Sequence, residues 1–165
     1  MTFTEIIQTK IFTDVQHFLP VLNHWKNAGE KVVFTNGCFD LVHRGHIDSL
    51  SKAADLGDRL IVGLNSDVSV IQLKGENRPL IDQQSRAILL ASLLMVDAVV
   101  IFDEETPYQL IQQVVPDVLV KGTEYKVEEI AGHDIVLAAG GKVERISLTE
   151  GFSTTDLIQK IKERY

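Results

Sequence analysis

The chain has 165 residues, which is the size of one compact domain and leaves no room for a second catalytic domain. Hydrophobic residues make up 45% and charged residues 24% of the sequence, so the chain can bury a core and is not expected to be disordered. The formal net charge of −7 argues against non-specific electrostatic binding to nucleic acid or to an anionic membrane. The single cysteine, Cys38, excludes an internal disulfide. Neither a membrane-length apolar run nor a signal peptide is present, which predicts a soluble cytoplasmic protein.

The first predicted element is an amphipathic helix over Asp14–Ala28. We expect Phe18 and Trp25 in this helix to pack against the core, because large aromatic side chains are usually buried. The predicted organisation is therefore a helical extension of residues 1–30 packed on a domain of residues 31–165, a single domain overall. Apolar residues of the extension could also cover a partner chain, which favours a homodimer.

Short apolar segments rich in β-branched residues recur along the rest of the chain and predict five strands: Lys31–Thr35, Arg59–Leu64, Ala98–Phe102, Asp117–Val120 and Lys142–Ile146. Helical patterns alternate with them, over Gly45–Leu56, Ser66–Leu73, Asp82–Met95, Thr106–Val115, Glu128–Ala139 and Thr154–Tyr165. This alternation predicts a Rossmann-like, three-layer α/β fold with a parallel sheet of about five strands and helices on both faces. Ligands of such folds bind at the carboxyl ends of the strands.

Three of these helices have recognisable start signals. Asp82 and Thr106 are expected as N-caps, and Pro107 is expected in the first helical position after Thr106. Ser153 or a neighbouring threonine is expected to start the last helix. A helix start at a strand end can offer its free N–H groups to an anion.

The most informative segment is Thr35–His46, TNGCFDLVHRGH, which follows the first predicted strand and enters a helix. A strand, a glycine-containing loop and a helix start together form a phosphate site, because N–H groups and the helix dipole point at the anion. The segment matches neither the dinucleotide fingerprint GxGxxG nor the ATPase loop GxxxxGK[ST]. Two imidazoles, of His43 and His46, can converge there on one phosphate. A zinc pair is the less favoured alternative, because the third ligand would have to be Cys38, Asp40 or a distant side chain.

The HxGH motif after TNGCFD, together with the late motif GFSTT at residues 151–155, resembles the nucleotidyltransferase superfamily that includes the cytidylyltransferases. The resemblance covers residues 31–165. It implies transfer of a nucleoside monophosphate from a nucleoside triphosphate to a phosphorylated acceptor, with release of pyrophosphate. Mg²⁺ is expected to be carried by the triphosphate and water, and no protein metal site is predicted.

A closer resemblance is to the adenylyltransferases that make ADP-heptose from D-glycero-β-D-manno-heptose 1-phosphate, a precursor of the lipopolysaccharide core. The stretches that carry it are FTNGCFDLVHRGH, LGDRLIVGLNSD, LKGENRP and VKGTEYKVEEIAG. The resemblance implies ATP and a sugar 1-phosphate as substrates. Glycerol-phosphate and choline-phosphate cytidylyltransferases usually have an arginine at the position of Leu148, which argues against CTP.

The resemblance and the strand-end rule together assign roles to individual residues. The groups expected to stabilise charge on the phosphates are His43, His46 and Lys74. Nucleotide binding is expected from Thr35, Asn36, Gly37, Phe39, Asp40, Gly45, Asn65, Asp67, Arg86, Gly151, Ser153 and Thr154. Acceptor binding is expected from Lys121, Gly122, Glu124 and Tyr125. No protein nucleophile is required, because an acceptor phosphate oxygen attacks the α-phosphorus directly.

Several of these residues also have structural interpretations. Asp40 could cap its own loop instead of touching a ligand, and Asp67 could simply cap a helix. Arg86 either contacts substrate or orders a loop. Arg78 is a weaker phosphate candidate that could equally lie on the solvated surface. Cys38 is expected as a small buried residue without a catalytic role.

Two other functions stay open on the sequence alone. A cytidylyltransferase acting on glycerol 3-phosphate or another phospho-alcohol would share the fold and the mechanism. A non-catalytic, nucleotide-binding regulatory module would keep the fold without turnover, although the intact histidine pair and STT motif argue against it. The partners expected for the leading hypothesis are ATP and a sugar phosphate, with neither nucleic acid nor a membrane.

Overall fold

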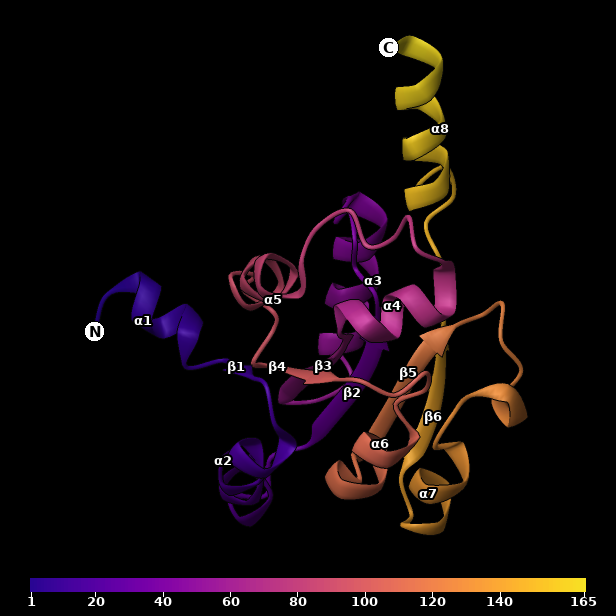
Figure 1. Ribbon diagram of the computed structural model, residues 1–165. Helices are drawn as coiled ribbons and strands as arrows, with labels where there is room; N and C mark the ends of the chain where they lie inside the picture. The colour runs from indigo at the N-terminus through magenta and orange to yellow at the C-terminus, as the bar shows by residue number, and fades with distance from the viewer.

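Six parallel strands form one sheet at the centre of the protein in the computed structural model, which describes all 165 residues (Figure 1). The strands are β1 (Ile11–Phe12), β2 (Val32–Gly37), β3 (Arg59–Asn65), β4 (Ala98–Phe102), β5 (Val118–Gly122) and β6 (Lys142–Ile146). Their order across the sheet is β1-β4-β3-β2-β5-β6, and every neighbouring pair is parallel. After β2 the chain adds β3 and β4 on one side and then β5 and β6 on the other. The order therefore reverses between β2 and β5, which is where ligands bind in such sheets.

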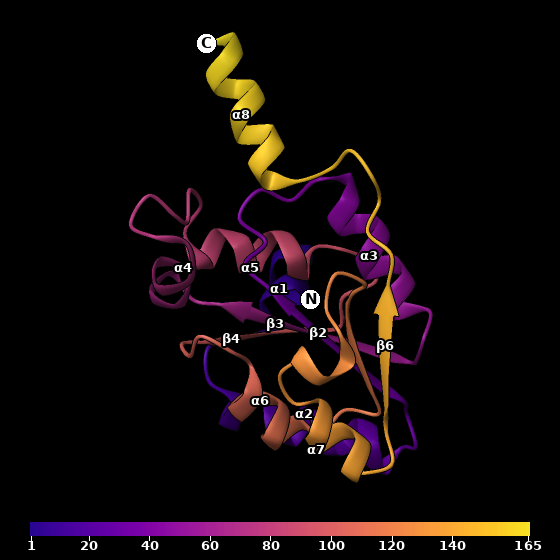
Figure 2. The same ribbon diagram turned by 90° about the vertical axis from the view of Figure 1, so that its right-hand side faces the viewer.

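Helices cover both faces of this sheet (Figures 1 and 2). They are α1 (Phe3–Gln8), α2 (Val15–Asn27), α3 (Arg44–Ala54), α4 (Asp67–Lys74), α5 (Gln83–Ala91), α6 (Tyr108–Val114), the 3₁₀ turn η1 (Val127–Glu129), α7 (His133–Ala138) and α8 (Thr154–Arg164). None of them combines the length and the apolar composition that crossing a membrane requires. The predicted Rossmann-like, parallel α/β fold is confirmed, with six strands instead of about five.

Two apolar cores lie on opposite faces of the sheet. On one face Phe34 and Ile61 join the buried side chains of α2, α6 and α7. On the other face Val33 and Leu60 join those of α3 and α5. Successive residues of the inner strands thus enter different cores, which explains why these strands are nearly continuously apolar, whereas the edge strand β6 (KVERI) is mixed.

The first thirty residues contribute directly to this architecture. Phe18 and Trp25 of α2 are buried, with ring centroids 5.6 Å apart at an interplanar angle of 68°, so their predicted packing role is confirmed. The strand β1, which sequence analysis did not predict, pairs with β4 at the edge of the sheet. The short helix α1 was not predicted either, and it buries none of its residues.

Most predicted helices are shifted by one or two residues at their ends, and three predictions need a larger correction. Asp82 is the N-cap of α5, as expected, but α5 ends at Ala91 because the chain then turns back toward β4. The N-cap of α6 is Pro107 and not Thr106, and no side-chain hydrogen bond caps this helix. The helix predicted over residues 128–139 is divided into η1 and α7. The backbone of Ile130 is extended and ends η1, and Gly132, with a φ of +83°, is the N-cap of α7.

Candidate active site

The histidine pair lies where the loop after β2 enters α3. His43 is the N-cap of α3, and its Nδ1 atom accepts a hydrogen bond from the N–H of Gly45 at 3.1 Å. The Nδ1 atom of His46 accepts from the N–H of His43 at 3.2 Å. The two rings stack with centroids 3.9 Å apart. Because each Nδ1 accepts a hydrogen bond, the proton of each neutral ring is on Nε2, which leaves two N–H donors for a ligand.

Both imidazoles are held in their neutral form. Burial, assisted by the charge of His43, lowers the pKa of His46 to about 4. Burial also lowers the pKa of His43 below its ordinary value. At neutral pH the pair can therefore offer hydrogen-bond donors to a ligand but no positive charge.

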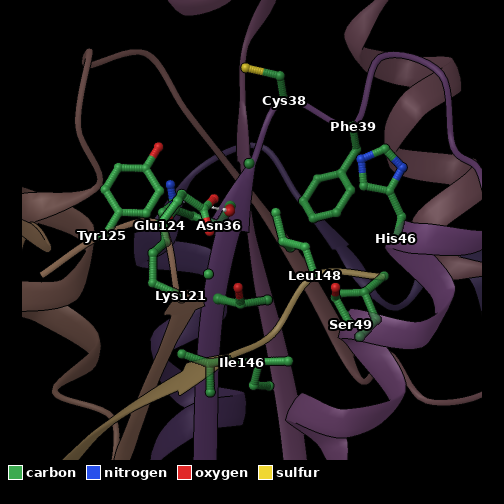
Figure 3. A pocket seen from close by; sticks show the side chains of 15 residues that line it. Asn36, Cys38, Phe39, His46, Ser49, Lys121, Glu124, Tyr125, Ile146 and Leu148 are labelled. Carbon is green, nitrogen blue, oxygen red and sulfur yellow. Dashed lines mark hydrogen bonds between the residues drawn. The ribbon is translucent and has the colours of Figure 1, made fainter. Parts of the chain in front are cut away.

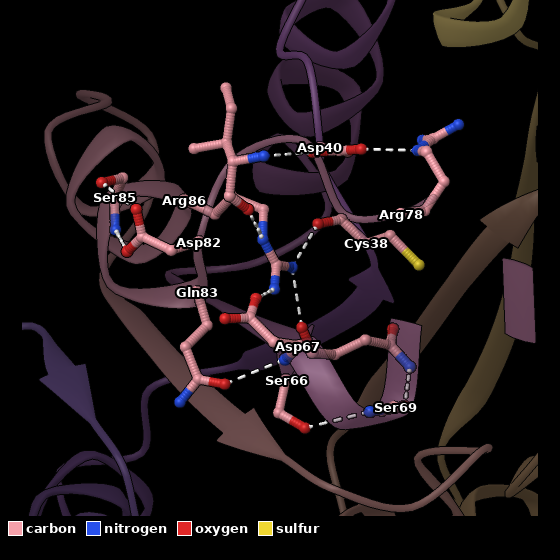
Figure 4. Close-up of polar contacts among 12 residues, drawn as sticks. Cys38, Asp40, Ser66, Asp67, Ser69, Arg78, Asp82, Gln83, Ser85 and Arg86 are labelled. Carbon is pink, nitrogen blue, oxygen red and sulfur yellow. Dashed lines mark hydrogen bonds and ion pairs between the residues drawn. The ribbon is translucent and has the colours of Figure 1, made fainter. Parts of the chain in front are cut away.

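A buried arginine links the residues at the ends of β2 and β3 (Figure 4). Arg86 has no exposed surface, and its guanidinium donates to the carbonyl oxygens of Cys38, Asn65 and Ile81 at 2.7, 2.7 and 2.9 Å. It also pairs with the carboxylate of Asp67 at 2.7 Å. Every guanidinium nitrogen thus has a protein partner. Of the two interpretations given to Arg86, the geometry favours ordering the loops, and the same bond gives Asp67 a positioning role beside its place in the first turn of α4.

A second hydrogen-bond network joins the loop after β2 to residues 78–81. The carboxylate of Asp40 is 2% exposed and accepts hydrogen bonds from the N–H groups of Leu80 and Ile81 at 2.8–2.9 Å. Arg78 donates to the same carboxylate at 2.6 Å, so this side chain does not lie free on the solvated surface. Burial raises the pKa of Asp40, but these donors outweigh it and hold the pKa below its ordinary value. The loop-organising interpretation of Asp40 is the one that its contacts support.

Two adjoining cavities open at the reversal point of the sheet. The small cavity, about 190 Å³, is drawn in Figure 3 and is lined by Thr35, Asn36, Gly37, Cys38, Phe39, His46, Ser49, Leu50, Val120, Lys121, Gly122, Glu124, Tyr125, Ile146 and Leu148. The large cavity, about 470 Å³, shares seven of these residues and adds Asp40, Asn65, Leu73, Lys74, Arg78, Glu105, Thr106, Pro107, Glu129, Ile130, Ala131, Thr154 and Thr155. The residues that line only the small cavity are mainly apolar, whereas the large cavity is lined by cations, hydroxyl groups and the carboxylates of Asp40, Glu105 and Glu129.

Lys121 stands at the boundary between the two cavities. It lies at the carboxyl end of β5, as predicted, and its ammonium group donates to both oxygens of Asn36 at 3.2–3.3 Å. The ring of Tyr125 is 5.5 Å from the same nitrogen. Burial lowers the pKa of Lys121, and the carboxylate of Glu124 opposes this effect. A cation held this way can reach a ligand in either cavity.

The late motif brings a helix start to the large cavity. Ser153, one of the residues expected to start α8, is its N-cap, and its hydroxyl oxygen accepts from the N–H of Asp156 at 3.0 Å. Thr154 and Thr155, which follow it, line the large cavity. The rest of α8 projects away from the body of the protein (Figures 1 and 2).

Most residues predicted for the site line one of the cavities. Those that line neither are His43, Gly45, Asp67, Arg86, Gly151 and Ser153, which hold or neighbour the lining residues.

Cys38 is half-buried and lines both cavities, so it is less enclosed than expected. Sequence reasoning missed the apolar wall of Leu50, Val120 and Ile146, although Ile146 lies at the end of β6, where the strand-end rule could have found it. No three His, Cys, Asp or Glu side chains come together as a group that could hold a metal ion.

The fold and the site define a Rossmann-like domain with two adjoining cavities at its strand-order reversal. A model of the cytidylyltransferase-like family matches residues 34–160, so the chain belongs to this family.

Relatives with known names agree with this placement. The bifunctional protein HldE of Syntrophotalea carbinolica is 53% identical over 145 residues, which are 88% of this chain and 30% of that protein. HldE of Caulobacter vibrioides is 55% identical over 141 residues, or 86% of this chain and 29% of that protein. The chain therefore spans less than a third of these relatives.

Two solved structures are similar in fold. The lipopolysaccharide core biosynthesis protein from Thermoplasma volcanium has a TM-score of 0.63 and 30% identity, covering 73% of this chain and 99% of that chain. Pantoate-beta-alanine ligase from Francisella tularensis has a TM-score of 0.61 and 16% identity, covering 92% of this chain and 76% of that chain. The second likeness supports the fold alone.

Proposed function

We propose that this chain transfers AMP from ATP to a sugar 1-phosphate, D-glycero-β-D-manno-heptose 1-phosphate, giving ADP-heptose and pyrophosphate for the lipopolysaccharide core. Membership of the cytidylyltransferase-like family supports the nucleotidyl transfer. The names of the HldE relatives and of the Thermoplasma protein support the pathway. We place the reaction in the cytoplasm and take Mg²⁺ to arrive with the triphosphate.

The observation that carries this proposal is the stacked pair of neutral histidines, of which His46 lines the large cavity together with Lys74 and Lys121. In the reaction an acceptor phosphate oxygen bonds to the α-phosphorus of ATP, while the bond from that phosphorus to the β-phosphate oxygen breaks. Negative charge grows on the α-phosphate and on the departing pyrophosphate. The Nε2–H groups of His43 and His46 can donate to that charge, and Lys74 and Lys121 can neutralise it.

We assign the two cavities to different parts of the substrates. The small cavity suits a flat base, because Leu50, Val120, Ile146 and Leu148 make most of its wall apolar. The large cavity suits phosphates and a polyhydroxylated acceptor. On this assignment Gly122 and Glu124, expected at the acceptor, contact the base instead, while Lys121 and Tyr125 reach both substrates.

Pyrophosphate release with each nucleoside triphosphate and Mg²⁺, combined with heptose 1-phosphate or glycerol 3-phosphate, tests the proposal. We expect turnover with ATP and heptose 1-phosphate, at a kcat/KM well above that of any other pair. Preference for CTP and glycerol 3-phosphate would establish the cytidylyltransferase alternative. Nucleotide binding without release of pyrophosphate in the presence of any acceptor would favour the regulatory alternative. The expected homodimer is a separate prediction, which light scattering of the purified chain decides.

A further inference from the structure

One face of α3 holds the segment that connects β6 to α8, residues 147–152. Arg44, Asp48 and Lys52 are spaced four residues apart and so lie along a single face of the helix. The ammonium group of Lys52 donates to the carbonyl oxygen of Ser147 at 3.3 Å, and the Thr149 hydroxyl donates to the Asp48 carboxylate at 2.9 Å. This row of contacts follows the connecting segment along the helix.

The row ends at the histidine pair. The guanidinium of Arg44 lies 5.7 Å from the centre of the Phe152 ring and 3.6 Å from the carboxylate of Asp48. The Phe152 ring is stacked near that of His43, with centroids 6.4 Å apart and an interplanar angle of 25°. A side chain on Gly45 would come within 3.0 Å of Phe152, so the segment and the start of α3 are in close contact.

These contacts matter because α8, which shares a cavity with residues 77–80, has little packing of its own. It buries none of its residues, and it projects from the body of the protein (Figure 2). The connecting segment nevertheless supplies Leu148 to the small cavity and leads into Thr154 and Thr155 of the large cavity. Thr149 lies between these two contributions, and the bond from its hydroxyl to Asp48 is the segment's shortest tie to α3.

We propose that Asp48 and Thr149 are positioning residues for the nucleotide: their hydrogen bond sets where the connecting segment presents Leu148 and the start of α8. This inference rests on the proposed function, because it takes the nucleotide to span both cavities. The two residues touch neither the reacting atoms nor the cavities, and they act through the residues on either side of Thr149.

Substitutions of Thr149 separate positioning from stability. Thr149→Val removes the hydroxyl at nearly constant size, and Thr149→Ser retains it. We expect Thr149→Val to raise the KM for ATP about tenfold, the scale of one hydrogen bond to a charged group, with the acceptor KM changed less than about twofold. Thr149→Ser should behave like the parent. Asp48→Asn keeps an oxygen that can accept from the Thr149 hydroxyl but loses the charge, so it should raise the KM for ATP by less than Thr149→Val does, and the double variant should be no worse than Thr149→Val alone.

The matched control is Asp55→Asn, which removes the same charge from an exposed position at the end of α3 where the carboxylate has no partner. Calorimetric titration of nucleotide without acceptor gives the binding constant independently of turnover. Parent-like affinity of Thr149→Val, or equal loss in Thr149→Ser, overturns the inference. If the parent binds another nucleotide instead of ATP, the proposed function fails. The positioning inference is then tested by comparing the affinities of the same Thr149 variants for that nucleotide. If the parent binds no nucleotide, both fail.

Discussion

The backbone N–H of His43 donates to Nδ1 of His46 at 3.2 Å, and this bond decides what the His46 ring can do. It turns Nε2–H toward the ligand side and would be lost if Nδ1 were protonated. The stacked ring of His43 makes a positive charge on His46 still less favourable. The pair is therefore built to donate hydrogen bonds while uncharged.

Removal of either ring should cost turnover and not folding. We expect His43→Ala and His46→Ala to lower kcat by about 10²–10³, the usual scale for losing one donor to transition-state charge. Their far-ultraviolet circular dichroism should match the parent, because the loop at a strand end lies outside both cores. The control is His17→Ala, an exposed histidine of α2. A kcat of His46→Ala within about threefold of the parent would contradict the donor role.

Protonation of His46 should make stability depend on pH in the acid range. Its pKa is about 4 in the folded protein against an ordinary value of 6.5, so the unfolded chain binds more protons between these values. Stability from this group is complete above pH 6.5 and declines as the pH falls toward 4. His46→Asn keeps an acceptor near Nδ1 but does not titrate, so it should lose less stability between pH 7 and pH 5, measured by urea unfolding. Equal losses in both proteins would show that His46 titrates normally.

The buried guanidinium of Arg86 should be required for the fold of the site. Arg86→Met retains volume but leaves Asp67 and three carbonyl oxygens without their donor. We expect the free energy of unfolding to fall by about 3–5 kcal/mol, as for other broken buried pairs. Arg164→Met, at the exposed end of α8, should change it by less than about 0.5 kcal/mol. Chemical denaturation measures the free energy of unfolding of the two variants. Similar values for Arg86→Met and Arg164→Met would contradict the structural role of Arg86.

The ammonium group of Lys121 should act mainly on the acceptor. Lys121→Met keeps the length of the side chain and removes its charge, so we expect a rise of at least about tenfold in the acceptor KM, larger than that for ATP. Lys126→Met changes an exposed lysine five residues later and should have no effect. Steady-state kinetics with each substrate varied in turn measures both constants. Unaltered acceptor dependence in Lys121→Met would rule out this role.

The parts of the site that could be predicted belong to short contiguous motifs. His43 and His46 are three residues apart, and the apolar strand before them locates their loop at a carboxyl end of the sheet. Lys121 followed from the same rule applied to β5. Local chemistry also located Asp82 and Ser153 as helix starts, since a capping side chain acts on its own first turn.

The parts that could not be predicted depend on pairing between distant segments. Asp40 and Arg78 are 38 residues apart, and nothing in either segment shows that they meet. The strand β1 has only two residues, so it carries no pattern, and it exists because β4 offers it an edge. Thr149 and Asp48 likewise become partners only once β6 runs beside α3.

The most direct test of the proposed reaction follows one oxygen atom. Heptose 1-phosphate labelled with ¹⁸O in its phosphate is incubated with ATP, Mg²⁺ and the protein. The ¹⁸O content of each product is then measured by mass spectrometry. We predict ADP-heptose that retains all the label, including the bridging oxygen, and pyrophosphate that contains none, because the acceptor oxygen attacks the α-phosphorus. Label in pyrophosphate, an AMP group attached to the protein, or the absence of any ADP-sugar would contradict the account.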